Sequence, residues 1–183
     1  MHRPDRLAAS ALATLCLALP GALIAQPDAA LASTVETLLS HPAGTHPADE
    51  TAVRTATIED CRLSLRHTSR KPESFTVFQT VALATLDTAQ AEVRHEDGYS
   101  PALIPLSGQH EAWTTFSTEH ATDKQRRYMA QVLKTPCERG ACSATVPLGG
   151  FIEFALWGDD APADMERVLS NLGQLAATCQ KDI

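Results

Sequence analysis

The chain has few aromatic residues, and it lacks the short motifs that identify the common enzyme classes. Aromatic residues make up 5% of its 183 residues, which disfavours a stacking platform for sugars or nucleic acid bases. The sequence contains no Gly-x-Ser-x-Gly elbow, no Ser-x-x-Lys pair and no glycine-rich loop for phosphate. Beyond the N-terminal region, no apolar run approaches the length of a membrane-spanning helix. We therefore expect a domain without an enzymatic activity, a cofactor or a membrane-inserted segment.

The N-terminal region has the pattern of a secretory signal peptide. Arg3 and Arg6 precede an apolar run over 7–24, which is interrupted by a proline and a glycine and is too short for a membrane anchor. Small residues then allow cleavage after Ala25 or after Ala32. The sequence predicts an exported protein that is either periplasmic or secreted, and the pattern does not choose between the two.

The remainder of the chain is predicted to hold one globular domain. Residues 1–25 form the predicted signal peptide, with an alternative end at residue 32. Residues 26–50 are predicted to be a short helix followed by a flexible linker, because two prolines and a glycine lie in the second half of this segment. The β-rich domain is predicted to span residues 51–183, a length that suffices for one hydrophobic core.

The formal net charge of −7 makes the chain acidic. An acidic surface repels the phosphates of nucleic acid and the head groups of anionic lipids, so neither is expected as the main partner. The same charge would steer association with a basic protein. We therefore expect a protein partner, and the oligomeric state stays open.

The cysteines are the most informative residues. After signal removal the chain keeps Cys61, Cys137, Cys142 and Cys179, and an even number in an exported protein favours two disulfides over a zinc site. Four residues that include Gly140 separate one pair, so Cys137 is predicted to bond Cys142 across a turn. Cys61 and Cys179 are each predicted to face the core, the first by strand parity and the second by helical spacing, and so to bond each other.

Alternation of polar and apolar residues predicts a series of antiparallel strands. The predicted strands are 61–65, 75–86, 91–95, 102–106, 110–116 and 143–157, and a helix is predicted over 33–40, with Ser33 and Glu36 as its capping box. Pro101 and Pro105 predict that their strand is an edge strand or is bulged, because proline lacks the N–H group of a ladder. Gly149-Gly150 predicts a bulge or corner within the last run.

The segment 119–134 fits either a helix or a strand, and we favour a strand that returns through the Cys137–Cys142 loop. Asp160 begins an amphipathic helix that reaches Cys179. The sum is an α+β fold: a mostly antiparallel sheet or partly open β-barrel of about seven strands, with one C-terminal amphipathic helix packed on it. The element order allows a pleckstrin-homology-like arrangement, on count and order alone.

Histidines are the one compositional indication of a metal site. Neutral imidazole binds zinc and copper, and the weak candidate ligands are His41, His46, His95 and His110. They do not share the spacing of ligands on one helix, so solvated polar residues are the favoured interpretation. We predict no tight metal site.

Three classes of function remain. The leading hypothesis is an exported non-enzymatic interaction domain, for example an inhibitor or immunity-type protein directed at an envelope enzyme. The first alternative is a histidine-mediated metal-binding periplasmic protein. The second is a hydrolase whose site forms only on folding, with the acidic pairs Glu96-Asp97 and Asp159-Asp160 as candidate carboxylates. Acidic pairs at turns and helix starts also have ordinary structural causes.

Overall fold

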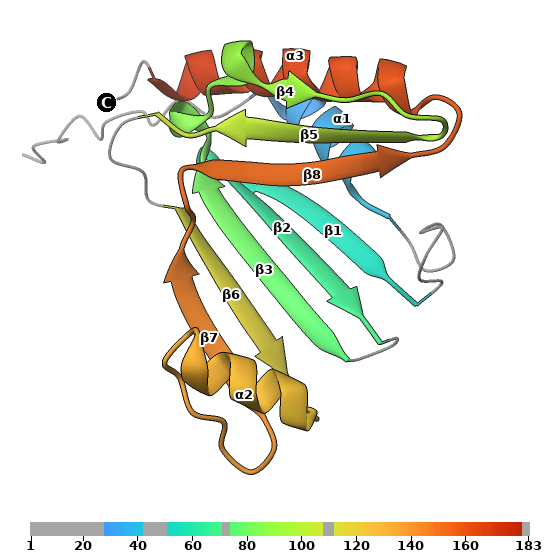
Figure 1. Ribbon diagram of the computed structural model, residues 1–183. Helices are drawn as coiled ribbons and strands as arrows, with labels where there is room; N and C mark the ends of the chain where they lie inside the picture. Colours follow the sequence, from blue (N-terminus) through green and yellow to red (C-terminus); the bar gives the residue numbers. More distant parts are fainter. Residues whose placement is uncertain (1–27, 42–50, 71–73, 108–111, 181–183) are drawn as a thin grey trace, which may run out of the picture.

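The computed structural model describes residues 28–41, 51–70, 74–107 and 112–180. Over these residues the protein is an α+β fold with eight strands in two antiparallel sheets, which do not close into a barrel. The orders are β1-β2-β3-β6-β7 and β4-β5-β8 (Figure 1). The elements are α1 (Ala29–Leu39), β1 (Val53–Glu59), β2 (Arg62–Ser69), β3 (Phe75–Ala82), the short 3-10 helices η1 (Leu83–Thr85) and η2 (Thr88–Gln90), β4 (Glu92–Val93), β5 (Tyr99–Pro105), β6 (Ala112–Thr118), α2 (Asp123–Gln131), β7 (Cys142–Pro147), β8 (Phe151–Trp157) and α3 (Ala161–Cys179).

The two ends of the five-stranded sheet are covered by different elements. In Figure 1, α1, α3 and the three-stranded sheet lie over one end, and α2 lies at the other. We call residues 28–41, 83–107 and 148–180 the proximal part. The distal end comprises α2, the loop that follows it and the adjoining strand residues; it is made of residues 66–70, 74–77 and 115–146.

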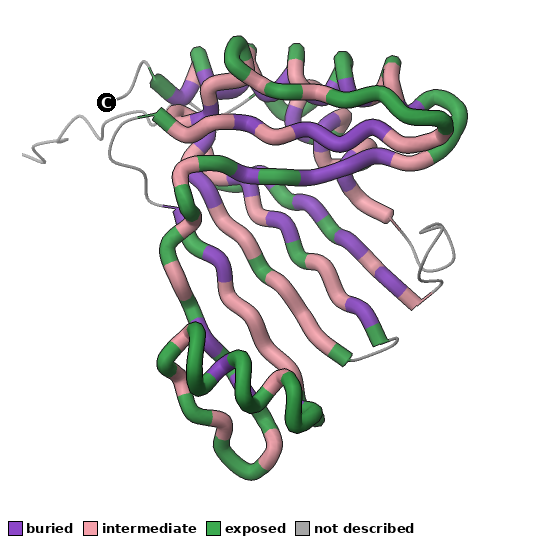
Figure 2. Tube along the Cα trace, in the orientation of Figure 1, coloured by how far each residue is buried: buried purple, intermediate pink, exposed green. Residues whose placement is uncertain are grey.

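The main hydrophobic core lies beneath the proximal part, where Figure 2 shows most of the buried residues. One face of the five-stranded sheet contributes alternate residues, and Leu63 is paired with Ile58 on one side and Val81 on the other. Helix α3 packs against α1, η1 and the strands β5 and β8 of the three-stranded sheet. It contributes a stripe of fully buried side chains to the same core: Met165, Val168, Leu172 and Leu175. Each such side chain contributes about 1.5–3 kcal/mol on burial, so this helix is a major part of the core.

A disulfide joins the first hairpin to the last helix. Cys61 and Cys179 have their Cα atoms 5.7 Å apart and their sulfurs at bonding distance, which is the pairing expected from the sequence. Cys61 does not lie in a strand, however. Asp60 and Cys61 both have positive φ (47° and 57°) and form the two-residue turn between β1 and β2, as type I′ hairpins require. Strand parity was therefore the wrong reason for placing Cys61 at the core.

The predicted corner at Gly149-Gly150 carries the chain from one sheet to the other. β7 ends at Pro147 in the five-stranded sheet, and β8 begins at Phe151 in the three-stranded sheet. Gly150 has a φ of +86°, a conformation that other residues rarely adopt. The backbone N–H of Leu106 donates to the carbonyl of Gly150 at 2.8 Å and joins the corner to the end of β5. The predicted run 143–157 is thus two strands.

β5 is the central strand of its sheet, so the edge position predicted from Pro101 and Pro105 is wrong. The carbonyls of both prolines accept hydrogen bonds on the β4 side, from the backbone N–H groups of Arg94 (3.1 Å) and Asp87 (3.0 Å). Since N–H and C=O of one strand residue point to the same side, the missing N–H groups also face that side. β4 has only two residues and pairs between the prolines, so no ladder bond is lost.

The segment 119–134 contains the helix α2, and the strand favoured there is wrong. Thr122 Oγ1 accepts a hydrogen bond from the backbone N–H of Gln125 at 3.3 Å, and Gln125 Oε1 accepts one from the N–H of Thr122 at 2.8 Å. This capping box begins the helix, and Met129 is buried against the sheet. β6 pairs directly with β7, so α2 and the loop after it form an excursion between two paired strands.

Helix α1 begins earlier than the predicted range 33–40. Asp28 caps it, because its Oδ1 accepts from two backbone N–H groups of the first turn at 2.9 and 3.3 Å. Ser33 therefore lies inside the helix, and the predicted capping box does not form. Glu36 Oε1 instead accepts a hydrogen bond of 2.6 Å from the backbone N–H of Ile58, which ties α1 to β1. The predicted linker falls largely on residues 42–50, outside the described residues.

Candidate ligand-binding site

The structure describes two of the four candidate histidine ligands, and each of the two contacts a different residue. His95 Nδ1 lies 3.1 Å from Ser100 Oγ, and His41 contacts an arginine of β1. His46 and His110 lie outside the described residues. Among the described residues, no three His, Cys, Asp or Glu side chains surround a common point. Nothing in this geometry favours the metal-binding alternative.

Arg54 is buried where α1, β1 and β8 meet, with 7% of its surface exposed. Its Nε donates to the carbonyl of Leu39 and its Nη2 to the carbonyl of Ala155, both at 2.6 Å, and Nη2 also contacts His41 Nε2. The Trp157 ring centroid lies 5.4 Å from Cζ. Burial lowers the pKa of Arg54 to about 10, so the guanidinium is charged at neutral pH. These contacts join α1 to the three-stranded sheet, which is a structural role.

The two acidic pairs considered for a hydrolase lie beside each other at one edge of the proximal part. Glu96-Asp97 is in the turn before β5, and Asp159-Asp160 precedes α3. A backbone hydrogen bond of 3.0 Å between the glycines beside them joins the two turns. All four side chains are exposed, and Asp160 is the N-cap residue of α3, where a negative charge is favourable. Turn and helix-end chemistry explains these residues without a catalytic role.

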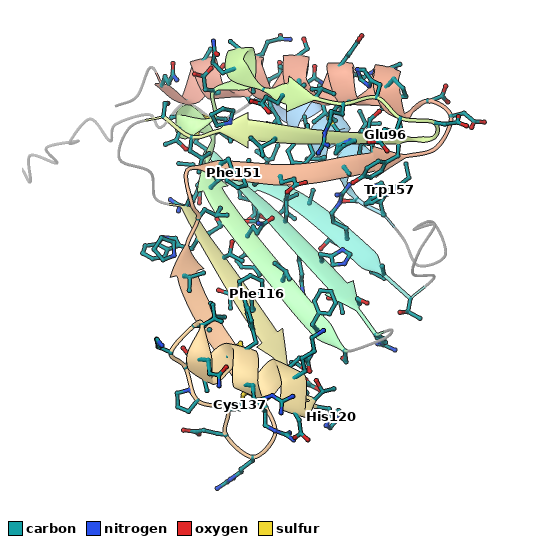
Figure 3. All side chains as sticks on the ribbon, viewed as in Figure 1. Glu96, Phe116, His120, Cys137, Phe151 and Trp157 are labelled. Carbon is teal, nitrogen blue, oxygen red and sulfur yellow. A yellow bond between two sulfur atoms is a disulfide. The ribbon has the colours of Figure 1, made fainter. Side chains whose placement is uncertain are left out.

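An open apolar pocket lies at the distal end, between α2 and the inner face of the five-stranded sheet. Its volume is about 270 Å³. The apolar walls come from β3, β6, β7 and α2: Phe75, Val77, Phe116, Cys142, Tyr128 and Met129. Phe116 is labelled on β6 above α2 in Figure 3. Lys124, Gln125, Ser117 and Thr118 supply the polar part of the lining. None of the described lining residues is a histidine or an acid.

A larger polar cleft lies on the opposite face of the same strand ends. Its volume is about 1170 Å³, and three arginines line it: Arg66, Arg70 and Arg139. Hydroxyl groups from both sides of the cleft lie between them, and one cross-strand pair is Thr68 Oγ1 and Thr76 Oγ1, 3.2 Å apart. Glu119 and Glu138 also border the cleft. The pocket and the cleft share the lining residues Phe75, Ser117, Thr118 and Cys142, which lie at the ends of β3, β6 and β7.

The loop after α2 is held by the second disulfide. Cys137 and Cys142 have Cα atoms 4.4 Å apart, the second pairing expected from the sequence. Arg139 and Gly140 both have positive φ (49° and 87°) and form the turn between the two cysteines. A small cluster of buried residues supports this region: Ala121, Met129, Cys142 and Ala144. The disulfide thus holds Arg139 at the cleft without a large core behind it.

Charge is segregated between the two regions. The described distal residues include seven Lys or Arg against Glu119, Asp123 and Glu138. The described proximal residues include eleven Asp or Glu against Arg94 and Arg167. The net charge of −7 therefore conceals a basic end on an acidic molecule. This basic end is the one that holds the pocket and the cleft.

Apart from the disulfide cysteine Cys142, the residues of the pocket and the cleft were not singled out by the sequence. A usable signal was present: the segment 119–141 has five Lys or Arg and three acids in a chain that is acidic overall. The pocket walls gave no such signal, because Val77 and Phe116 belong to strands whose alternation predicts an inner face but not what covers it. Thr122 and Gln125 had the spacing of a capping box and would have identified α2.

Comparison with known proteins adds no family. No family model, curated protein or solved structure matches this chain at significant similarity. None of the helices in the described ranges is long and apolar enough to cross a membrane.

Proposed function

We propose that the protein is an exported, non-enzymatic binding domain that holds the apolar part of a ligand beneath α2. The observation that carries the proposal is the open pocket of about 270 Å³, whose walls are aromatic, aliphatic and sulfur-containing side chains. Binding sites in proteins are characteristically apolar concavities with a few polar groups at defined positions. Export is part of the proposal because two disulfides favour an oxidising compartment and the N-terminus resembles a signal peptide.

The composition of the pocket supports binding rather than catalysis. Hydrolysis requires a general base or nucleophile near the bound group, and that base is most often a histidine or a carboxylate. The described lining residues include neither, and Cys142, the cysteine among them, is bonded to Cys137. An inhibitor or immunity-type protein is one form of this proposal, in which an apolar side chain of the partner occupies the pocket.

The test is a titration of the chain from Gln26 onward with the fluorescent apolar dye 1-N-phenylnaphthylamine. We expect saturable binding to one site, with a fluorescence increase as the dye leaves water. Val77→Phe places a ring in the pocket and is expected to weaken binding at least about tenfold, or about 1.4 kcal/mol. Thr80→Phe, on the other face of β3, adds the same ring outside the pocket and is the matched control.

Thr80→Phe is expected to leave dye affinity within about twofold of wild type, about 0.4 kcal/mol. Both variants are first checked for an unchanged circular dichroism spectrum and a cooperative unfolding transition. Equal loss in the two variants, or no saturable binding by the wild-type chain, would show that the pocket does not bind apolar groups.

A further inference from the structure

The pocket and the cleft together have the polarity of one particular ligand class. We infer that the ligand is a single-chain anionic amphiphile, with its tail in the pocket and its head group in the arginine-lined cleft. The inference rests on the proposed function and adds the chemistry of the ligand. The two cavities share Phe75, Ser117, Thr118 and Cys142 at the strand ends, and the inferred ligand would pass around these ends to reach both.

The cleft has the donors that an anionic head group requires. Guanidinium groups present paired N–H donors that match carboxylate, phosphate and sulfate oxygens. Arg66, Arg70 and Arg139 line the cleft, and none of them is in an ion pair among the described residues. Nearby acids do not neutralise them fully, since Glu119 and Glu138 are the two acids in the described lining. Hydroxyl groups between the arginines supply further donors.

The pocket determines the shape of the tail. Protein sites for drug-sized ligands are about 300–1,000 Å³ in volume. At about 270 Å³ the pocket lies just below that range, so it has room for one alkyl chain and not for a two-chain lipid. The apolar walls provide no partner for a polar tail, which would lose its hydrogen bonds to water on entry.

The charge of the region selects the sign of the head group. The distal end is basic, and Lys124 places a further ammonium group in the pocket lining. An anion approaching this end is attracted, whereas the acidic proximal part repels it and so orients the encounter. The net charge of the whole chain predicts a basic partner. The local charge at this site predicts an acidic ligand instead.

The experiment compares three probes with the same ten-carbon chain, used below the concentrations at which they form micelles. Sodium decanoate, decanol and decyltrimethylammonium bromide are titrated into the Gln26–Ile183 chain by isothermal calorimetry. We expect decanoate to bind at least about tenfold more tightly than the other two, or about 1.4 kcal/mol. The advantage is expected to shrink as sodium chloride is raised, because salt screens the charges.

Variants separate the head-group site from general electrostatics. The double variant Arg66→Glu/Arg139→Glu is expected to weaken decanoate binding at least about tenfold while dye binding changes less than about twofold. Arg127→Glu reverses a charge on α2, outside both sets of lining residues, and is the matched control. It is expected to change decanoate affinity less than about threefold, the size of a long-range effect.

The possible failures are distinguishable. If decanol binds as tightly as decanoate while the dye binds normally, the anionic inference is wrong and the proposed function stands. If neither the dye nor any ten-carbon probe binds, both are wrong. Co-sedimentation with vesicles of phosphatidylglycerol and phosphatidylcholine (1:3) tests the other source of an anionic head group. Binding to these vesicles without binding of monomeric decanoate would overturn the single-chain ligand.

Discussion

The proximal part and the distal end of this protein are built on the same sheet but are supported very differently. The main core lies between the proximal part and the five-stranded sheet, where α1, α3 and both sheets enclose it. The disulfide Cys61–Cys179 links residues 118 positions apart in the sequence. The distal end has one small buried cluster and a disulfide that spans 5 residues. The two regions also have opposite charge.

Together with the proposed function, this difference assigns stability mainly to the proximal part and ligand binding to the distal end. Most of the buried side chains lie in the main core, so the distal end can keep an open apolar pocket and three cleft arginines that are in no ion pair among the described residues. Both features are unfavourable for stability, and binding regions are commonly the less stable parts of a structure. The following changes test whether stability is divided in this way.

The largest contrast is expected between the two disulfides. On the chain-entropy model, Cys61→Ser/Cys179→Ser lowers the free energy of unfolding by about 5 kcal/mol, and Cys137→Ser/Cys142→Ser by about 2 kcal/mol, because the closed loops differ in length. Equilibrium urea unfolding of the two double variants measures both values. Equal losses would contradict the division, since the short bridge would then hold as much structure as the long one.

A second contrast compares a core side chain from each region. Leu172→Ala leaves a cavity in the enclosed core and is expected to cost about 3 kcal/mol of unfolding free energy. Met129→Ala is expected to cost about 1 kcal/mol, because Met129 already borders an open pocket and its loss creates little new cavity. Urea unfolding checks the totals, and hydrogen exchange of α2 amides should increase in Met129→Ala alone.

A third change concerns the first turn of α1 in the proximal part. A chain that starts at Ser33 lacks the Asp28 cap and the buried Ala32, so it is expected to lose about 1–2 kcal/mol relative to a chain that starts at Gln26. We accordingly expect export to release a protein that begins at Gln26. Intact mass of the exported product checks this site, and equal stability of the two chains would remove the reason for it.

The smallest effects are expected from single charge reversals at exposed sites. Arg127→Glu in the distal end and Glu166→Lys on α3 are each expected to change the free energy of unfolding by less than about 0.5 kcal/mol. Thermal and urea unfolding measure this directly. If either variant changed the free energy of unfolding by more than about 1 kcal/mol, the separation of charge between the two regions would contribute to the stability of the fold.

Sequence patterns predicted the elements whose signals are local. The terminal helix from Asp160 to Cys179 repeats its apolar residues at helical spacing, and Gly149-Gly150 indicated the corner between two strands. Sequence patterns failed where the same residues fit both a helix and a strand. Tyr128 and Val132 fit a helix face together with Met129 and a strand face together with Ala130. The capping box that decides for the helix involves only Thr122 and Gln125.

The sequence by itself determined the class of the fold, the local pair Cys137–Cys142 and the acidic balance, because alternation, cysteine spacing and composition are properties of the chain. The pair Cys61–Cys179 was predicted correctly, but from a strand position that Cys61 does not have. Only the tertiary structure decided the proposed binding region. Phe75, Phe116 and Met129 belong to three different elements and line one pocket once α2 packs against β7. Strand alternation assigns a residue to a face, but the packing of another element decides whether that face becomes a core, a pocket or open surface.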